Sequence, residues 1–240
     1  RKLQQRERRM ALLCSAFGLV LLVAVRRRLP ETLAEPQPLP GLSGLLALYG
    51  ALLRAPAFRF YVLTVALSSG VFFTFLGGAP HIVVTGLGLS PRDYALAFLA
   101  TSGFFAFGNF LAGRYSQRFG VVRMIGIGTT ISFVGTGCGL AAMLWLPPSL
   151  GALFLPTVLM AIGNGISQTN GMMAALSVRP QLAGTASGLT GFSQMGFGAV
   201  MSWIAGVLED GHGIATTGLM LACAVATQLV LAVMRARRIA

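Results

Sequence analysis

The stretch Leu150–Ala174, LGALFLPTVLMAIGNGISQTNGMMA, runs for 25 residues without a charged side chain. A bilayer core of about 30 Å is crossed by a helix of about 20 apolar residues, so this stretch is long enough to span a membrane. Its polar residues are amides and hydroxyls, which a helix in lipid tolerates where neighbouring helices hydrogen-bond to them. The segment therefore predicts a membrane-spanning helix that packs against other helices.

Similar apolar runs lie on both sides of this segment. We predict further spans at Met10–Val25, Phe58–Ala79, Tyr94–Ala112, Val121–Leu146, Ala183–Leu208 and Gly213–Met234. The mean hydropathy of the chain is +0.77, and 10% of its residues are charged, against about 25% in soluble domains. Only helices and closed barrels satisfy the backbone in lipid, and no period-two alternation is visible. The fold class is therefore all-α integral membrane, with about seven transmembrane helices in a lipid bilayer.

The arginines are distributed unequally between the connections. Alternate connections hold twelve of them, whereas the intervening ones hold only Arg92. Cytoplasmic loops carry the excess of basic residues, so this split places the C-terminus in the cytoplasm. The net charge of +12 therefore consists of orientation signals, and we expect no nucleic-acid partner. The twelve arginines are Arg26, Arg27, Arg28, Arg54, Arg59, Arg114, Arg118, Arg123, Arg179, Arg235, Arg237 and Arg238.

The N-terminal end departs from this rule. Residues 1–9 carry five basic side chains on the side that seven spans would place outside. A secretory signal peptide is one interpretation, but Arg26–Arg28 follow the apolar run and no small-residue cleavage site is present. We favour a chain that is part of a longer protein. Its predicted segments are residues 1–28 with the first span, a cytoplasmic loop at 29–56, and a six-helix bundle at 57–240.

The cytoplasmic loop divides into two parts. Residues 29–40 are rich in proline, which breaks helices, so no continuous helix is expected there. The stretch Leu42–Arg54 is apolar and too short to span, and we predict an interfacial helix that leads into the next span.

Groups that carry proton or bond chemistry are scarce. The acidic residues all lie outside the predicted spans or at their ends, so we expect no buried carboxylate of the kind that carries protons in membranes. No Ser/His/Asp set, metal-ligand spacing or phosphate-binding loop occurs, and these absences predict no enzyme activity, no metal and no cofactor. The acidic residues are Glu7, Glu31, Glu35, Asp93, Glu209 and Asp210.

The polar residues inside the spans are neutral. Asn164 and Gln168 are four apart and share one helix face, and Gln194 lies in the following span. They are open to two interpretations: hydrogen bonds between helices, or the wall of a substrate cavity. Two phenylalanine clusters, at 72–75 and at 104–107, wrap around their helices, so each directs at least one ring inward. An inward ring would make a cavity suited to hydrophobic ligands.

Glycines recur at a spacing that places them on one helix face. Gly135 and Gly139, Gly184 and Gly188, and the set Gly198, Ser202 and Gly206 are four apart. Such faces allow close helix approach in lipid.

Several motifs together resemble a known family. The run Leu29-Pro-Glu-Thr-Leu33 with the Pro-rich stretch after it, followed by Leu52-Leu53-Arg54, looks like the central loop of the Bcr/CflA drug-resistance transporters of the major facilitator superfamily. The segment Gly108–Gly120 resembles the superfamily's short cytoplasmic loop motif. The runs Gly163–Ser177 and Ala183–Gln194 are similar to the family's tenth and eleventh spans.

The resemblance implies that the seven spans are the sixth to twelfth of a twelve-helix protein. It implies proton-driven efflux of small amphipathic drugs by alternating access across a bacterial inner membrane. The proton site would then lie in an N-terminal half that precedes this chain, and the chain alone would be inactive. Arg114 and Arg118 would form a cytoplasmic gate or act only as topology signals. The implied substrate-cavity residues are Ser68, Phe72, Phe105, Asn164, Gln168 and Gln194.

Two other functions remain open at this stage. The same fold could export a sugar or another metabolite, although such sites offer more polar and charged groups than this chain does. The chain could also be a non-transporting assembly module, a half-protein that pairs with a separate partner.

Overall fold

The computed structural model describes residues 2–28 and 41–237, which fall into two compact units, residues 1–41 and 42–240. The first unit contains α1, Lys2–Arg28, a continuous helix that includes the predicted span Met10–Val25. Its role as a membrane span stays a prediction. The Pro-rich stretch 29–40 lies outside the described residues.

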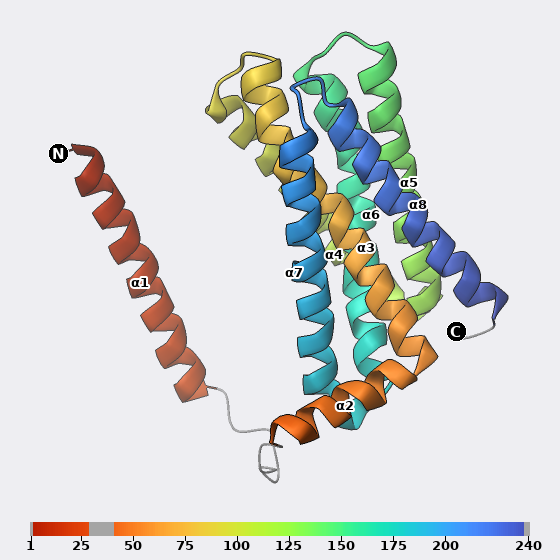
Figure 1. Cartoon of the computed structure of the whole chain (residues 1–240). Coiled ribbons are helices and arrows are strands. Elements are labelled where there is room, and N and C mark those ends of the chain that lie inside the picture. Colours follow the sequence, from red (N-terminus) through yellow and green to blue (C-terminus); the bar gives the residue numbers. More distant parts are fainter. Residues whose placement is uncertain (1, 29–40, 238–240) are drawn as a thin grey trace. The chain divides into compact units, whose positions relative to one another are not determined.

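The second unit contains six helices that are long and apolar enough to cross a membrane within the described residues (Figure 1). It begins with α2, Leu42–Arg54, the predicted short helix. The spans are α3, Pro56–His81, with a π-helical turn at Ile82–Gly86; α4, Pro91–Phe119; α5, Val121–Trp145; α6, Leu150–Ser177; α7, Ala183–Leu208, after a 3₁₀ turn at Pro180–Leu182; and α8, Ile214–Ala236. The predicted all-helical membrane bundle is thereby confirmed.

Local signals set the ends of α4. Ser90 Oγ accepts a hydrogen bond from the Asp93 backbone N–H at 3.3 Å, and Asp93 Oδ2 accepts one from the Ser90 backbone N–H at 3.0 Å. This reciprocal capping box satisfies two N–H groups that a helix start leaves without partners. At the other end, Gly120 has a φ of +86°, which favours glycine and stops the helix. The helix is therefore longer than the predicted Tyr94–Ala112.

The arginines gather at one end of this unit. Chain direction alternates between successive spans, so one end carries the start of α3, the α4–α5 and α6–α7 connections and the end of α8. We call it the arginine-rich end, and it lies at the bottom of Figure 1. Its described arginines are Arg54, Arg59, Arg114, Arg118, Arg123, Arg179, Arg235 and Arg237.

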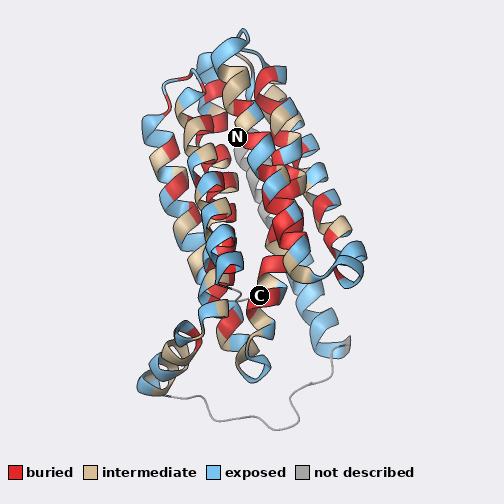
Figure 2. Ribbon diagram, turned by 90° about the vertical axis from the view of Figure 1, so that its right-hand side faces the viewer, coloured by how far each residue is buried: buried red, intermediate tan, exposed pale blue. Residues whose placement is uncertain are grey.

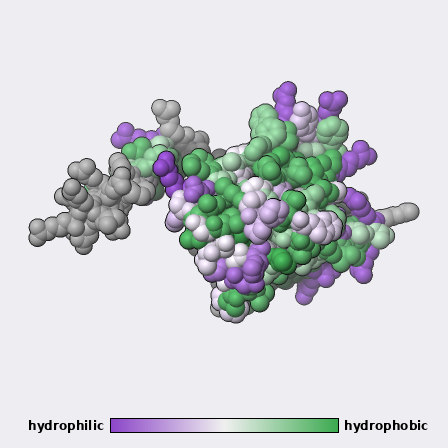
Figure 3. All heavy atoms as spheres, turned by 90° about the horizontal axis from the view of Figure 1, so that it is seen from above, coloured by the Kyte–Doolittle hydropathy of each residue, from purple (hydrophilic) through white to green (hydrophobic). Residues whose placement is uncertain are grey.

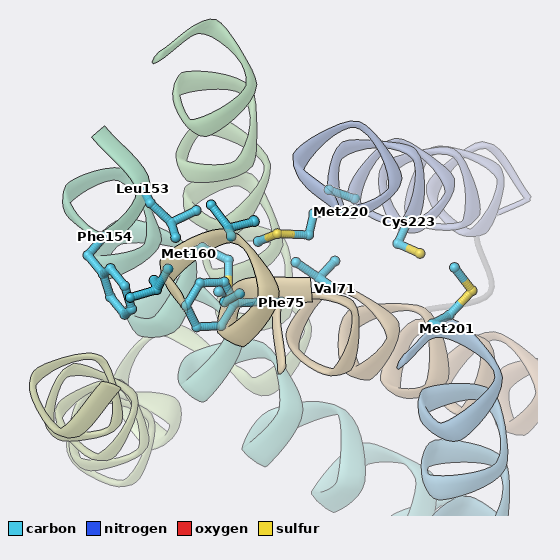
Figure 4. Close-up of a cluster of buried hydrophobic side chains, with 12 residues drawn as sticks. Val71, Phe75, Leu153, Phe154, Met160, Met201, Met220 and Cys223 are labelled. Carbon is cyan, nitrogen blue, oxygen red and sulfur yellow. The ribbon is translucent and has the colours of Figure 1, made fainter. Parts of the chain in front are cut away.

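Helices α3 and α6 are the most buried spans, whereas α4 and α7 bury the least of their length. Figure 2 shows buried residues along the inward surfaces of the helices and exposed ones on the outside. One core cluster joins α3, α6, α7 and α8, and Figure 4 shows Phe75, Met160, Met220 and Met201 from these four helices. Exposed leucines and valines on the outer surfaces are expected where lipid is the solvent.

Glycines bring two backbones close together where α5 meets α6, the most extensive contact between described helices. A Cβ on Gly128 would lie 2.7 Å from Gly163 O and 2.7 Å from Ser167 N. Gly135 of α5 likewise lies against the backbone of α6, since a Cβ there would meet Met160 N. This contact confirms the close packing predicted for Gly135. The prediction is wrong for Gly184 and Gly188 within the described part of the chain, because no described atom lies within 4 Å of a Cβ at either position.

The third glycine set joins α7 to α3. A Cβ on Gly198 would meet the Phe73 ring, and a Cβ on Gly77 would meet the backbone of Ser202. Small residues on both helices thus allow backbone contact, as predicted for Gly198 and Ser202.

We expect Gly128→Ala and Gly137→Ala, both in α5, to change stability in opposite directions. Gly128→Ala pushes α6 away and should destabilise the protein by about 1–3 kcal/mol, the usual result of overpacking. Gly137 has open space around its Cβ position, so Gly137→Ala should stabilise by roughly 0.5–1 kcal/mol through helix propensity. Thermal unfolding of the purified variants in detergent measures both, and equal effects would contradict the packing argument.

Candidate functional site

Four predicted cavity residues form one chain of hydrogen bonds across three helices. Gln194 Nε2 of α7 donates to Gln168 Oε1 of α6 at 2.7 Å, and Gln168 Nε2 donates to Asn164 Oδ1 at 2.9 Å. Asn164 Nδ2 then donates to the backbone oxygen of Ser68 in α3, also at 2.9 Å. We call Ser68, Asn164, Gln168 and Gln194 the amide chain.

The amide chain runs from the core toward the surface. Asn164 has no exposed area and Ser68 is 5% exposed, whereas Gln168 and Gln194 are half-buried. Each side-chain amide both donates and accepts, so the inner members satisfy one another and the outer members reach a position where a ligand could replace a partner. The bonds between helices agree with the structural interpretation, and the cavity role of these residues stays a prediction.

The two predicted aromatic residues lie beside the amide chain. Phe72 follows Ser68 by one helical turn, and its ring centroid is 5.7 Å from that of Phe105 in α4. Both are half-buried. Phe104 and Phe107 instead point outward, with exposed fractions of 40% and 48%, so the phenylalanine cluster of α4 directs one ring inward as predicted.

Three further aromatic residues extend this pair and were missed from the sequence. Phe98 packs against Phe72 at 6.4 Å and stacks with Tyr94 at 5.8 Å, and Tyr94 contacts Phe154 of α6 at 6.3 Å between centroids. Two of them, Tyr94 and Phe98, could have been found from their spacing relative to Phe105. Tyr94, Phe98 and Phe105 fall at i, i+4 and i+11, which places them on one helix face.

A second set of polar contacts joins α4 to α6 nearer the arginine-rich end. Asn109 Oδ1 accepts from Thr169 Oγ1 at 2.8 Å, and Asn170 Oδ1 accepts from Ser116 Oγ at 2.6 Å. A cavity of about 140 Å³ adjoins Ser116 and Thr169. These hydrogen bonds between helices fix α4 against α6.

Arg114 and Arg118 are exposed near the end of α4. The Arg118 guanidinium carbon lies 5.6 Å from the centroid of the Phe119 ring, a cation–π distance. The carboxylates whose side chains the structure describes, Asp93, Glu209 and Asp210, all belong to the opposite end of the bundle. A gate at these arginines therefore needs a partner from outside the described part, and the gate role stays a prediction.

Glu209 corrects one expectation from the sequence. It lies between α7 and α8 as predicted, yet it is only 6% exposed, so a buried carboxylate is present. Its Oε1 accepts from the backbone N–H groups of Gly211 at 3.0 Å and Gly213 at 2.8 Å, and its Oε2 accepts from the Thr216 N–H at 3.1 Å and from the Thr216 hydroxyl.

These donors explain how a carboxylate can be buried at this end. They include backbone groups at the start of α8, where the helix dipole favours a negative charge. Gly213, the residue before α8, has a φ of +78°, which lets the chain turn back onto the carboxylate. Figure 3 looks onto this end, where hydrophilic and hydrophobic residues lie side by side. Glu209 is therefore best explained as a cap that fixes the α7–α8 turn.

No three His, Cys, Asp or Glu side chains in the described ranges lie together in the manner of a metal site. The residues that the structure brings together at the candidate site are neutral: a chain of hydrogen-bonded amides, with a pair of aromatic rings one helical turn away.

We expect Glu209→Gln to destabilise the protein by about 2 kcal/mol. The amide places an N–H₂ where Oε2 accepts two hydrogen bonds, and hydrogen bonds to a charged group contribute about 1.5–3 kcal/mol. Asp210→Asn is the matched control, because Asp210 is exposed and accepts only from the His212 N–H through Oδ1. It should change stability by less than about 0.5 kcal/mol. Thermal unfolding compares the two, and a Glu209→Gln variant as stable as Asp210→Asn would remove the capping role.

Comparison of the sequence with known proteins identifies a family and several relatives. The sequence model of the Major Facilitator Superfamily matches residues 8–202. The multidrug transporter MdfA of Edwardsiella piscicida is 26% identical over 193 residues, which cover 78% of this chain and 45% of that protein. The bicyclomycin resistance protein homolog of Haemophilus influenzae is 27% identical, over 78% of this chain and 47% of that protein. The chain thus spans about half the length of the curated relatives it matches. These relatives confirm the resemblance to drug-resistance transporters.

Proposed function

The chain belongs to the Major Facilitator Superfamily, and from this premise we propose that it forms the C-terminal part of a drug/proton antiporter. The whole protein would export small amphipathic compounds across a bacterial inner membrane by alternating access. Two findings support this proposal: the names of the relatives, and the neutral, amphipathic site between α3, α4, α6 and α7.

The observation that carries the proposal is that the amide chain and an aromatic pair lie one helical turn apart on α3. Ser68 and Phe72 are one turn apart on α3, so the two kinds of group meet on one helix face. Rings at Phe72 and Phe105 bury the apolar part of a compound without demanding one shape. Gln168 and Gln194 supply donors and acceptors without a fixed charge. Such a wall suits compounds of varied structure, because few precise polar contacts are imposed.

The same observation argues against the sugar exporter. A sugar presents many hydroxyls, and each one buried without a partner costs about 1–3 kcal/mol. The half-buried polar groups at this site are the two glutamines, and the remainder of the wall is aromatic. The site therefore favours an amphipathic drug over a sugar or another polar metabolite.

Proton coupling is assigned to the part of the protein outside this chain. The described spans contain no carboxylate in their middle, and Glu209 is engaged by four donors at one end. Amides and aromatic rings do not titrate near neutral pH, so the proton carrier would lie in an N-terminal half. Helices α4 and α7, which bury the least within this unit, supply the surfaces that such a half would cover. We therefore expect the chain alone not to transport.

Transport by the joined halves tests this proposal. We expect proteoliposomes that hold this chain fused behind a five-span N-terminal half to take up an amphipathic dye under a proton gradient, and proteoliposomes with the chain alone to take up none. Phe105→Ala should lower kcat/KM about tenfold, because about 1.4 kcal/mol of contact is lost. Phe133→Ala, which truncates an exposed ring on α5, a helix outside the proposed site, should stay within about twofold.

Two results would contradict the proposal. Uptake by the chain alone would show that the site is complete without a partner. Joined halves that are stably assembled yet inactive toward dyes and sugars would favour the assembly module.

We further propose that the C-terminus is cytoplasmic, because the arginine-rich end carries the basic connections. Alkaline phosphatase fused after Ala240 should be inactive, since the enzyme folds only outside the cytoplasm. The same enzyme inserted after Pro147, in the turn between α5 and α6, should be active. The reverse pattern would invert the orientation.

A further inference from the structure

A groove on the outer surface between α5 and α8 has no part in the proposed transport site. Its volume is about 480 Å³, and it is lined by Arg123, Gly126, Ile127, Thr130, Ile131 and Arg235. This volume falls within the range of about 300–1,000 Å³ that holds small molecules. The two helices contact each other here, within a single compact unit.

We propose that this groove binds the headgroup of an anionic phospholipid. Arg123 and Arg235 come from opposite walls and are both exposed. The carboxylates with described side chains all lie at the other end of the bundle, so none of them neutralises this pair. Two guanidinium groups at one groove match a phosphodiester, because Arg presents several N–H donors to phosphate oxygens. Basic pockets between transmembrane helices are the known form of lipid headgroup sites.

The backbone around the groove favours an anion as well. Arg123 lies in the first turn of α5, whose N-terminus has no side-chain cap. The free N–H groups of a helix start and the helix dipole already attract negative charge, and a cation placed there is unfavourable without an anion nearby. Arg235 in the last turn of α8 is favourable for its own helix, so its position alone demands no ligand. The position of Arg123 is therefore stronger evidence for a bound anion than the position of Arg235.

The glycine at the base of the groove makes this arrangement possible. A Cβ on Gly126 would collide with the Arg235 guanidinium, whose Cζ lies 3.7 Å from that position. The guanidinium thus lies directly on the backbone of α5 and reaches the same groove as Arg123. Gly126 thus makes room for the Arg235 side chain and does not bring two helix backbones together.

The remaining lining residues fit the rest of a lipid. Two helical turns from the arginines, Gln228 Nε2 of α8 donates to Thr130 Oγ1 of α5 at 3.4 Å, so the groove also offers a neutral polar residue, Thr130. Ile127 is 46% exposed and Ile131 is half-buried, so acyl chains would run over an apolar surface. A soluble phosphate would use only the two arginines, whereas a phospholipid uses the whole groove.

Native mass spectrometry of the purified 240-residue chain with an equimolar mixture of phosphatidylglycerol and phosphatidylethanolamine tests the site. Each Arg near an anionic lipid contributes about fivefold in affinity, so we expect the two arginines to favour phosphatidylglycerol about 25-fold. In Arg123→Gln/Arg235→Gln the preference should fall to about twofold. Arg54→Gln/Arg59→Gln is the matched control, since it removes two exposed charges from the same end outside the groove, and it should keep the full preference.

A second variant tests whether lipid binding needs the shape of the groove as well as its two positive charges. Thr130→Trp keeps both arginines and fills the groove, so it should also lose phosphatidylglycerol. Absence of preference in the unmodified chain, equal loss in the control pair, or full retention in Thr130→Trp would each overturn the proposal. Displacement of the lipid by an equal concentration of soluble glycerol 3-phosphate would do so too, because it would identify a free phosphate site.

Discussion

The structure depends on the inability of hydrocarbon to hydrogen-bond a polar group. This constraint makes every described span a helix, and it acts on side chains as well, since a buried polar side chain must find a partner on another helix or on its own backbone. Asn164 illustrates the result: it has no exposed area, it accepts from Gln168, and it donates to the backbone of α3. The candidate site is thus also a structural joint, because the groups available to a ligand are held in place by the groups that connect the helices.

The same constraint determines how closely the helices pack. Lipid provides no hydrophobic drive between apolar helices, so contact requires van der Waals packing over small residues. Gly128 and Gly163 let the backbones of α5 and α6 touch, and Gly77 with Ser202 do the same for α3 and α7. Larger side chains were free to occupy the remaining inner surfaces, and Phe72 and Phe105 do so where α3 meets α4. The bundle therefore has two kinds of interface: backbone contacts over small residues at α5–α6 and α3–α7, and ring contacts between α3 and α4.

The sequence predicts the spans well because hydrophobicity and length are local properties. The predicted Ala183–Leu208 coincides with α7, and Leu42–Arg54 coincides with α2. The ends of α3 and α4 were missed, since polar turns can continue a helix beyond the apolar core of a span. For the site, helical spacing predicts which residues share a face of one helix, but it does not predict contacts between helices. Asn164 and Gln168 share a face by arithmetic, but the bond from Gln168 to Gln194 depends on how α6 and α7 pack. The burial of Glu209 depends likewise on a turn that folds backbone donors around it.

The charge distribution separates three tasks in one chain. Arginines gather at one end, where we propose that they orient the helices, a buried carboxylate caps a turn at the other end, and the middle of the bundle is neutral. In the proposed transporter, a neutral middle would accept varied compounds because no fixed charge has to be matched or desolvated, but it would offer no carboxylate to bind a proton. If the protein is the antiporter proposed above, coupling would act through geometry: protonation in the other half would change which surfaces of α4 and α7 are covered. The amide chain joins α3, α6 and α7 through hydrogen bonds, so a displacement of α7 would be transmitted to α3, the helix that carries Phe72, without a titratable group along the way.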